Sequence, residues 1–484
     1  MLKAAYAKWH GPRSWAVSAA GGGLVGWLVS RGVPAQWNAD GVTPVVGAWL
    51  VAPFVALLAS IAVMPFLAHR FWHRHYPDLS LALGGLVAGY FLGAFAAPGY
   101  RHAWSYGSYA MWHAVMEYYS FIALVGGLFL ISGGIVVEVR GRGGPVLNTL
   151  LLAAGAVLAN LIGTTGASVL LIRPFIRANA GRLAPMHVVF FIFIVSNCGG
   201  SLTPIGDPPL YLGYLKGVPF FWTVEHLWSD WLLVNALLLA TFLAYDAHVG
   251  RRQRIAGVHP HASGHQRERF AVSLRGIVAM AGLGLLVAGV FIPKLVDRFA
   301  PEWSAWPIGP TFQLGVAAAC LALSPKENFR LNGFTLEPIK EVGLLFAGIF
   351  VTMVPALAYL SVHGNELGLS SASSFYLGTG SLSAVLDNAP TYLNFLQIAV
   401  GREIDPPAIS AFLGTEHGRM LLHAISNAAV FFGAMTYIGN GPNFMVKAIA
   451  EGEGVRMPSF LGYVLRALLV LTPILGVHWL VFVR

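Results

Sequence analysis

Charged residues are scarce in this sequence of 484 residues. Asp, Glu, Lys and Arg make up 11% of the chain, whereas a soluble globular domain carries about 25%. That deficit excludes an ordinary water-soluble fold. Hydrophobic residues make up 56%, and many of their runs reach the length of about 20 residues that crosses the hydrocarbon of a bilayer. The chain is therefore predicted to be an all-α, polytopic membrane protein.

Cysteine is scarce as well, and the familiar catalytic motifs are missing. Cys198 and Cys320 both lie in apolar stretches, so we expect neither a disulfide framework nor a zinc site. The sequence contains no His-Glu-x-x-His motif, no Gly-x-Ser-x-Gly elbow and no phosphate-binding loop. We therefore expect no enzyme and no cofactor, unless a sodium ion is bound. The formal charge of +9 indicates a positive-inside bias rather than a nucleic-acid partner.

Apolar spans are predicted along most of the chain. Two further apolar regions, 148–176 and 371–400, are interrupted by Ile162-Gly163-Thr164-Thr165-Gly166 and by Leu386-Asp387-Asn388-Ala389-Pro390-Thr391. Each could be a full span or a re-entrant hairpin. The predicted spans are 46–69, 79–97, 119–138, 186–214, 227–246, 273–293, 307–323, 341–361, 418–446 and 459–482.

The basic residues decide between these alternatives. With two hairpins, each half crosses the membrane an odd number of times, and most of the 30 Lys and Arg residues fall on one side. If both regions were full spans, the Lys and Arg residues would be divided about equally between the two sides of the membrane. We therefore predict two inverted repeats with about 10–11 transmembrane helices plus two hairpins. The first hairpin should open to the cytoplasm and the second to the exterior of the inner cell membrane.

Four segments follow from this topology. Residues 1–45 contain an apolar stretch that is either a signal peptide or a retained extra helix. We favour the retained helix. The first repeat is 46–246, with hairpin 148–176 and broken helix 186–214. Residues 247–272 form a basic cytoplasmic linker. The second repeat is 273–484, with hairpin 371–400 and broken helix 418–446.

The breaks themselves share a pattern. Thr203-Pro204-Ile205-Gly206-Asp207-Pro208-Pro209 in the first half matches Thr436-Tyr437-Ile438-Gly439-Asn440-Gly441-Pro442 in the second. Proline cannot continue a helix, and freed backbone groups survive at membrane depth only inside protein or beside water. Broken helices at matched positions are typical of the binding sites of secondary transporters.

Candidate site residues cluster at these breaks. A charge at the membrane centre costs on the order of 3 kcal/mol, so Asp207 in the first break and Asp387 at the second hairpin tip are the strongest candidates for a sodium or proton site. The expected cation or proton ligands are Asp207, Asp387, Asn197, Asn388, Thr203 and Ser383; the expected substrate contacts are Thr164, Thr165, Asn160, Thr391, Thr436, Asn440 and Asn443. His423 is interpreted either as a packed polar residue or as a proton relay.

These motifs resemble the ion transporter superfamily, which includes citrate and dicarboxylate carriers, arsenite efflux pumps and NhaD-type sodium/proton antiporters. Ser196-Asn197, Thr203-Pro204-Ile205-Gly206-Asp207 and Ser383-Ala384-Val385-Leu386-Asp387-Asn388 are most similar to the NhaD-type signatures. The resemblance implies a scaffold domain and a mobile transport domain, often in a homodimer embedded in membrane lipid.

One departure affects the expected substrate. The first hairpin reads Ile162-Gly163-Thr164-Thr165, without the acidic residue usual in NhaD-type proteins and closer to carboxylate carriers. Two carboxylates facing one site would repel an anion unless cations neutralise them, so sodium/proton exchange is the first expectation. Cation-coupled symport of a small carboxylate such as citrate comes second, and arsenite or anion efflux third.

Single cysteines in a background without Cys198 and Cys320 test the predicted topology. Position 260 should be labelled by an impermeant reagent only from the cytoplasm, and positions 164 and 388 should be reached from opposite sides. Labelling of position 260 from outside intact cells would contradict the inverted arrangement.

Overall fold

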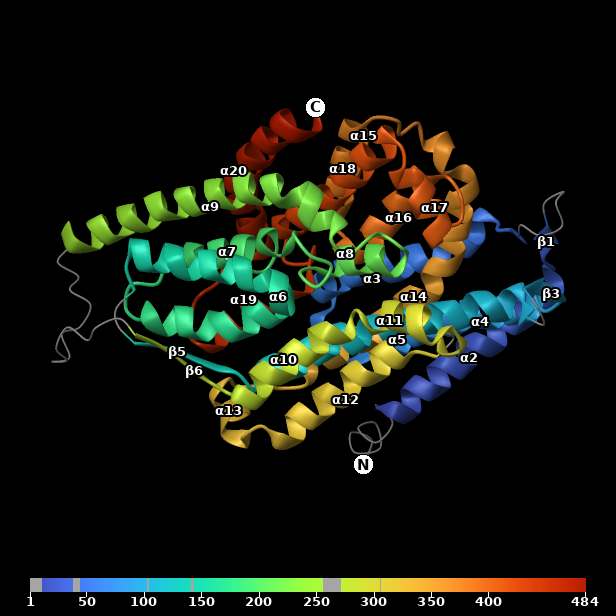
Figure 1. The fold of residues 1–484 in the computed structure, drawn as a ribbon, viewed down its shortest axis with the longest axis horizontal. Helices are drawn as coiled ribbons and strands as arrows, with labels where there is room; N and C mark the ends of the chain where they lie inside the picture. Colours follow the sequence, from blue (N-terminus) through green and yellow to red (C-terminus); the bar gives the residue numbers. More distant parts are fainter. Residues whose placement is uncertain (1–10, 38–43, 102–103, 141–142, 256–270, 305) are drawn as a thin grey trace. The chain divides into compact units, whose positions relative to one another are not determined.

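The computed structural model describes residues 11–37, 44–101, 104–140, 143–255, 271–304 and 306–484, and these residues are mostly helical (Figure 1). Seven of the described helices are long and apolar enough to cross a membrane; counting the bent pair α10 (Ile277–Gly289) and α11 (Ile292–Phe299) as one span gives up to eight. The described strands form three two-stranded antiparallel ribbons. The predicted class of an all-α polytopic membrane protein is confirmed.

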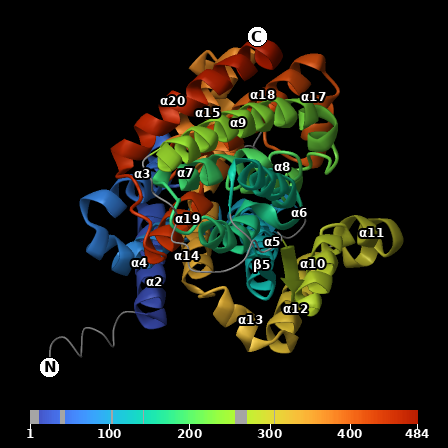
Figure 2. The same cartoon turned by 90° about the vertical axis from the view of Figure 1, so that its left-hand side faces the viewer.

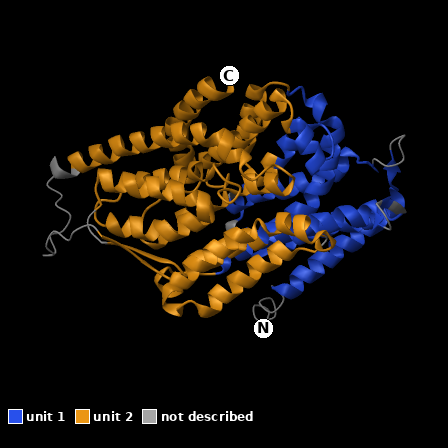
Figure 3. Ribbon diagram, in the orientation of Figure 1, with its two compact units in different colours: residues 1–122, 336–369, 393–412 blue, residues 123–335, 370–392, 413–484 orange. Residues whose placement is uncertain are grey.

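The chain divides into two compact units, each assembled from separate stretches of sequence (Figure 3). Unit 1 comprises 1–122, 336–369 and 393–412, and unit 2 comprises 123–335, 370–392 and 413–484. Three helices cross from one unit into the other, namely α5 (Tyr106–Gly133), α16 (Asn388–Val400) and α17 (Pro406–Leu413). The remaining elements of unit 1 are α2 (Pro12–Gly32), β1 (Gln36–Trp37), β2 (Pro44–Val45), η1 (Ala48–Val51), α3 (Ala52–Leu67), α4 (His69–Ala94), β3 (Pro98–Arg101), β4 (Trp104–Ser105), α14 (Glu337–His363) and η4 (Gly364–Leu367).

Close backbone contact joins α2 and α4 within unit 1. At Gly22 and Gly26 of α2, an added Cβ would overlap the carbonyl groups of Ala82 and Leu86 in α4. Gly85 and Gly89 of α4 meet the backbone of α2 in the same way. Small residues allow helices to approach in lipid, where the hydrophobic effect cannot hold them together. The helix at the N-terminal end is therefore an integral part of the packing of unit 1.

Unit 2 contains the hairpin, the broken helices and the helices around them. Its elements are β5 (Val136–Arg140), α6 (Pro145–Ala178), α7 (Pro185–Ile194), η2 (Cys198–Gly200), α8 (Pro208–Leu215), α9 (Trp222–Ile255), β6 (Ala271–Arg275), α10, α11, η3 (Pro301–Trp303), α12 (Ile308–Leu323), α13 (Lys326–Leu331), α15 (Ala372–Ser383), α18 (Glu416–Phe432), η5 (Gly433–Met435), α19 (Gly441–Gly452), α20 (Phe460–His478) and the π-helical turn η6 (Trp479–Val483). Of the predicted linker 247–272, α9 contains the first residues, β6 begins near its end, and 256–270 lie outside the described residues.

Helix α6 folds back on itself at Gly163. A straight α-helix of its 34 residues would be about 51 Å long, yet Asn148 and Asn179 near its two ends exchange hydrogen bonds of 2.7 and 2.9 Å. Gly163 has φ 76° and ψ 154°, a conformation that favours glycine. The region expected to be the first hairpin therefore consists of two antiparallel arms.

The open end of this hairpin is bonded to α7 and α9. The buried Asp246 of α9 accepts a hydrogen bond from Asn148 at 2.7 Å, forms an ion pair with Arg182 and contacts His187 of α7 at 3.0 Å. Helices α6, α7 and α9 accordingly pack together (Figures 1 and 2). This contact fixes the base of the hairpin and leaves its tip to be positioned by other residues.

Valine at Gly26 should destabilise the protein, because its side chain would overlap the α4 backbone; overpacking of this kind costs about 1–3 kcal/mol. Gly21→Val, at a position of the same helix where an added Cβ meets no atom within 4 Å, is the matched control. Thermal unfolding of both purified variants measures the difference. Equal melting temperatures for Gly26→Val and Gly21→Val would show that the α2–α4 contact does not form.

Candidate functional site

Two unwound segments interrupt the helices of unit 2. Between the end of α7 at Ile194 and the start of α8 at Pro208, the chain contains only the short turn η2. Between the end of α18 at Phe432 and the start of α19 at Gly441, it contains only the short turn η5. Proline lies at the first or second position of α8 and of α19, where its missing N–H costs nothing. The first unwound segment is buried over most of its length. Its backbone groups therefore need partners inside the protein.

The first unwound segment bonds through its backbone to the turn of α6, the second bonds to the start of α16, and the two arrangements match. In each, a backbone N–H outside the break donates to a glycine carbonyl in the break, and that glycine's own N–H donates to a threonine hydroxyl. The first set is Thr164 N to Gly206 O (2.8 Å) and Gly206 N to Thr203 Oγ1 (3.1 Å); the second is Asn388 N to Gly439 O (3.2 Å) and Gly439 N to Thr436 Oγ1 (3.1 Å). The similarity noted between the two sequence segments thus extends to their hydrogen bonding.

Asp207 lies where these two arrangements meet. Its Oδ1 accepts hydrogen bonds from Thr164 Oγ1 (2.8 Å) and Asn440 Nδ2 (2.9 Å), and its Oδ2 accepts one from Asn388 Nδ2 (2.6 Å). The residue is 1% exposed. Among the described residues, no Lys, Arg or His forms an ion pair with it. Neutral donors alone surround this carboxylate, and a buried charge without a counter-ion is costly, so the position favours a bound cation or a proton.

A second layer of amides joins the two breaks. Asn197 Nδ2 donates to Asn443 Oδ1 (2.6 Å), and Asn440 Nδ2 also approaches Asn197 Oδ1 at 3.2 Å. Asn443 in turn donates to the Thr436 carbonyl at 2.9 Å. Asn160 of the first hairpin donates to the Gly199 carbonyl at 2.6 Å. These amides satisfy backbone groups that the breaks expose, and they position the donors around Asp207.

Other predicted site residues lie outside the Asp207 network. Asp387 is half-buried, and its Oδ1 accepts from the backbone N–H of Ala389 at 3.0 Å. Ser383 donates to the Ala429 carbonyl (2.6 Å), and Thr391 donates to the Asp387 carbonyl (2.9 Å). In the described part of the chain, no hydrogen bond joins these three side chains to Asp207. Asp387 and Thr391 stabilise the start of α16, and Ser383 links α15 to α18.

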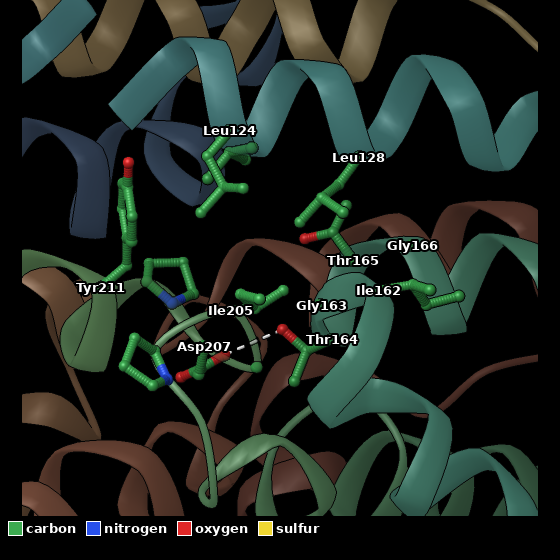
Figure 4. Close-up of a pocket in the computed structure, with 14 residues that line it drawn as sticks. Leu124, Leu128, Ile162, Gly163, Thr164, Thr165, Gly166, Ile205, Asp207 and Tyr211 are labelled. Carbon is green, nitrogen blue, oxygen red and sulfur yellow. Dashed lines mark hydrogen bonds between the residues drawn. The ribbon is translucent and has the colours of Figure 1, made fainter. Parts of the chain in front are cut away.

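A cavity of about 20 Å³ adjoins Asp207. The carboxylate and Thr164 point toward one another on one side of it, Leu124 and Leu128 extend from α5 on the other, and Tyr211 of α8 lies at one end (Figure 4). Space of this size holds about one water molecule. In this conformation the site can therefore accept a small ion or a water, but not a larger organic molecule.

Sequence reasoning missed two other buried carboxylates. Asp246 ends the predicted span 227–246, and Asp230 lies inside the same span. The structure shows both fully buried, with histidines as partners. The only sequence signal was an acidic residue inside an apolar segment, because its partners are far away along the chain. Arg173 of α6 likewise pairs with a residue distant in sequence, Glu453, at 3.4 Å.

Many apolar helices, buried unwound segments between them and a buried carboxylate where these segments meet are typical of a membrane transporter. The chain matches the family described as "putative citrate transport" over residues 43–483 and belongs to that family. This agrees with the resemblance to the ion transporter superfamily, whereas the closer resemblance to NhaD-type antiporters stays a prediction. No curated protein sequence matches the chain.

Alanine at Asn440 should destabilise the protein, because Asp207 and Asn197 would each lose a donor. The loss should be about 1–3 kcal/mol of unfolding free energy. When Asp207 is already replaced by alanine, the further substitution Asn440→Ala should cost less unfolding free energy than it does in the parent. No carboxylate then remains that needs the amide of Asn440 as a donor. Denaturant unfolding of the parent, both single variants and the double variant measures the coupling. Strictly additive losses would contradict a direct Asn440–Asp207 interaction.

Proposed function

We propose that this protein is a secondary transporter of citrate or a related small carboxylate, coupled to a cation bound at Asp207. The family match supports the substrate class. The observation that supports coupling is the buried Asp207 carboxylate, which among the described residues accepts hydrogen bonds from three neutral donors, Thr164, Asn388 and Asn440. An anionic substrate would be repelled by this charge. A sodium ion or proton at Asp207 removes that repulsion, so cation and carboxylate would bind together.

The first hairpin tip is the element we expect to contact the carboxylate. Gly163, Thr164 and Thr165 line the cavity beside Asp207, and this tip carries no acidic side chain. The cavity admits only a water-sized species, so a tricarboxylate would enter after the tip moves away from Gly206. The matched hydrogen bonds of the two tips support the proposal that the halves are inverted repeats, with their hairpins opening to opposite sides.

Sodium/proton exchange is the second candidate, and a specific observation favours it. Thr164, Asn388 and Asn440 already donate to Asp207, and a substrate carboxylate would compete for the same donors. A nearby acceptor, Asn388 Oδ1, is buried and has no hydrogen-bond partner among the residues that the structure describes. Buried oxygens of this kind suit a cation. Under this alternative, a proton and a sodium ion would occupy Asp207 in turn.

Proteoliposomes decide between the two candidates. Uptake of labelled citrate and of sodium would be measured for the parent with and without sodium and pH gradients. Citrate accumulation that depends on a cation gradient supports symport. Sodium movement driven by a pH gradient, without citrate exchange, would support antiport instead.

Asp207→Asn keeps the shape of the side chain but removes its charge, so cation-driven citrate accumulation should fall by about tenfold or more. Asp297→Asn, at an exposed position of α11, is the matched control and should accumulate citrate like the parent. Normal accumulation by Asp207→Asn would show that the coupling ion binds elsewhere. Size-exclusion profiles of both variants establish that they are folded.

A further inference from the structure

A second buried acidic group in unit 2 has histidine partners. Asp230 of α9 is 0% exposed, and its Oδ1 receives three contacts: His478 Nε2 of α20 at 2.7 Å, His423 Nε2 of α18 at 3.0 Å and Asn427 Nδ2 of α18 at 2.9 Å. Three helices therefore converge on a single carboxylate oxygen. The network around Asp207 does not include this group.

The two histidines have different hydrogen-bonding environments. An ionised Asp230 can only accept, so His478 Nε2 carries the hydrogen and His478 Nδ1 accepts from the Tyr376 hydroxyl at 2.9 Å. Both ring nitrogens of the fully buried His478 are thereby used. His423 has an 18% exposed side chain, and in the described part of the chain its Nδ1 has no hydrogen-bond partner. His423 is therefore the ring that can take up a proton.

The other polar and charged groups nearby leave this assignment unchanged. Ser229 Oγ donates to Asp230 Oδ2 at 3.3 Å, and Tyr376 of α15 bonds to His478. Arg419, one turn before His423 on α18, donates to the Leu413 carbonyl at 3.0 Å. No Lys or Arg among the described residues forms an ion pair with Asp230. A protonated imidazole is thus the cation available to neutralise it.

We propose that His423 and Asp230 form a second ion site, distinct from Asp207, that carries a proton coupled to transport in addition to the cation at Asp207. A proton from water binds His423 Nδ1, the resulting imidazolium pairs with Asp230, and release of that proton restores the neutral ring. The role in coupling rests on the function proposed above, whereas proton binding itself stands on the geometry of the cluster.

The surrounding helices connect this cluster to both unwound segments. Helix α18 carries His423 and continues into the second break, whose Asn440 binds Asp207. On α9, the residues after Asp230 hold the first break: Trp231 Nε1 donates to the Gly199 carbonyl at 2.7 Å, and Asn235 Nδ2 donates to the Cys198 carbonyl at 3.2 Å. A shift of α9 relative to α18 would therefore move the residues that bond to both unwound segments.

His423→Gln tests the proposal, because glutamine can still donate to Asp230 but cannot take up a proton. In proteoliposomes containing a pH-sensitive dye, proton movement driven by a citrate gradient should fall by about tenfold. Counterflow of labelled citrate at equal pH should fall far less. His417→Gln, an exposed histidine of the same helix, is the matched control and should behave like the parent. If His423→Gln does not fold, Asp230→Asn replaces it with the same expected loss.

The outcomes separate this inference from the proposed function. Parent-like proton movement in both variants would overturn the proton site while leaving citrate transport intact. Absence of citrate counterflow in the parent would overturn citrate as the substrate. In that case proton movement driven by a sodium gradient is measured for the same variants. Loss of proton movement would support the His423–Asp230 site, and parent-like proton movement would overturn it. Equal loss of counterflow and proton movement would show that His423 serves substrate binding or folding rather than proton coupling.

Discussion

Unwound backbone at membrane depth is the constraint on which the rest of unit 2 depends. Lipid offers no hydrogen bonds, so each amide and carbonyl freed by a break must find a partner within the protein. Here the partners include the amides of Asn160, Asn197, Asn440 and Asn443, together with the backbone at the α6 turn and at the start of α16. The two breaks are bonded to one another, and Asp207 receives donors as a result. The candidate site and the residues that satisfy the freed backbone groups are therefore largely the same.

Three buried carboxylates in unit 2 have three different kinds of partner. Asp207 has amides and a hydroxyl, Asp230 has two imidazoles, and Asp246 has a guanidinium, an imidazole and an amide. The partner determines what each group can do. A carboxylate paired with arginine is permanently neutralised and serves as an anchor. One paired with histidine has a partner that can exchange protons, and one with neutral donors favours a bound cation or a proton. Buried acids of similar appearance in sequence thus differ in the chemistry open to them.

The sequence predicted the helical membrane fold, the interruption at Gly163 and the position of Asp207 at a break between helices, because low charge, glycine and proline act locally. It also grouped Asn197, Asn388 and Asn440 with Asp207, since matched breaks of a repeated pattern converge in space. It could not show that Asp387 lies outside the hydrogen-bond network of Asp207. The Asp387 carboxylate accepts instead from the backbone N–H of Ala389 at the start of α16, and this depends on the local backbone conformation. Asp230 and His478 were missed for a related reason: they are 248 residues apart, and no local pattern connects them.

The two breaks are attached to their neighbours through main-chain groups, and this has an evolutionary consequence. Thr164 and Asn388 each bond to a glycine carbonyl through their own backbone N–H. These connections therefore do not depend on which side chain either residue carries. Substitutions at these positions would change the donors around Asp207 while the backbone contacts stay in place. The chemistry of this region is thus free to diverge without any change in the framework that supports it.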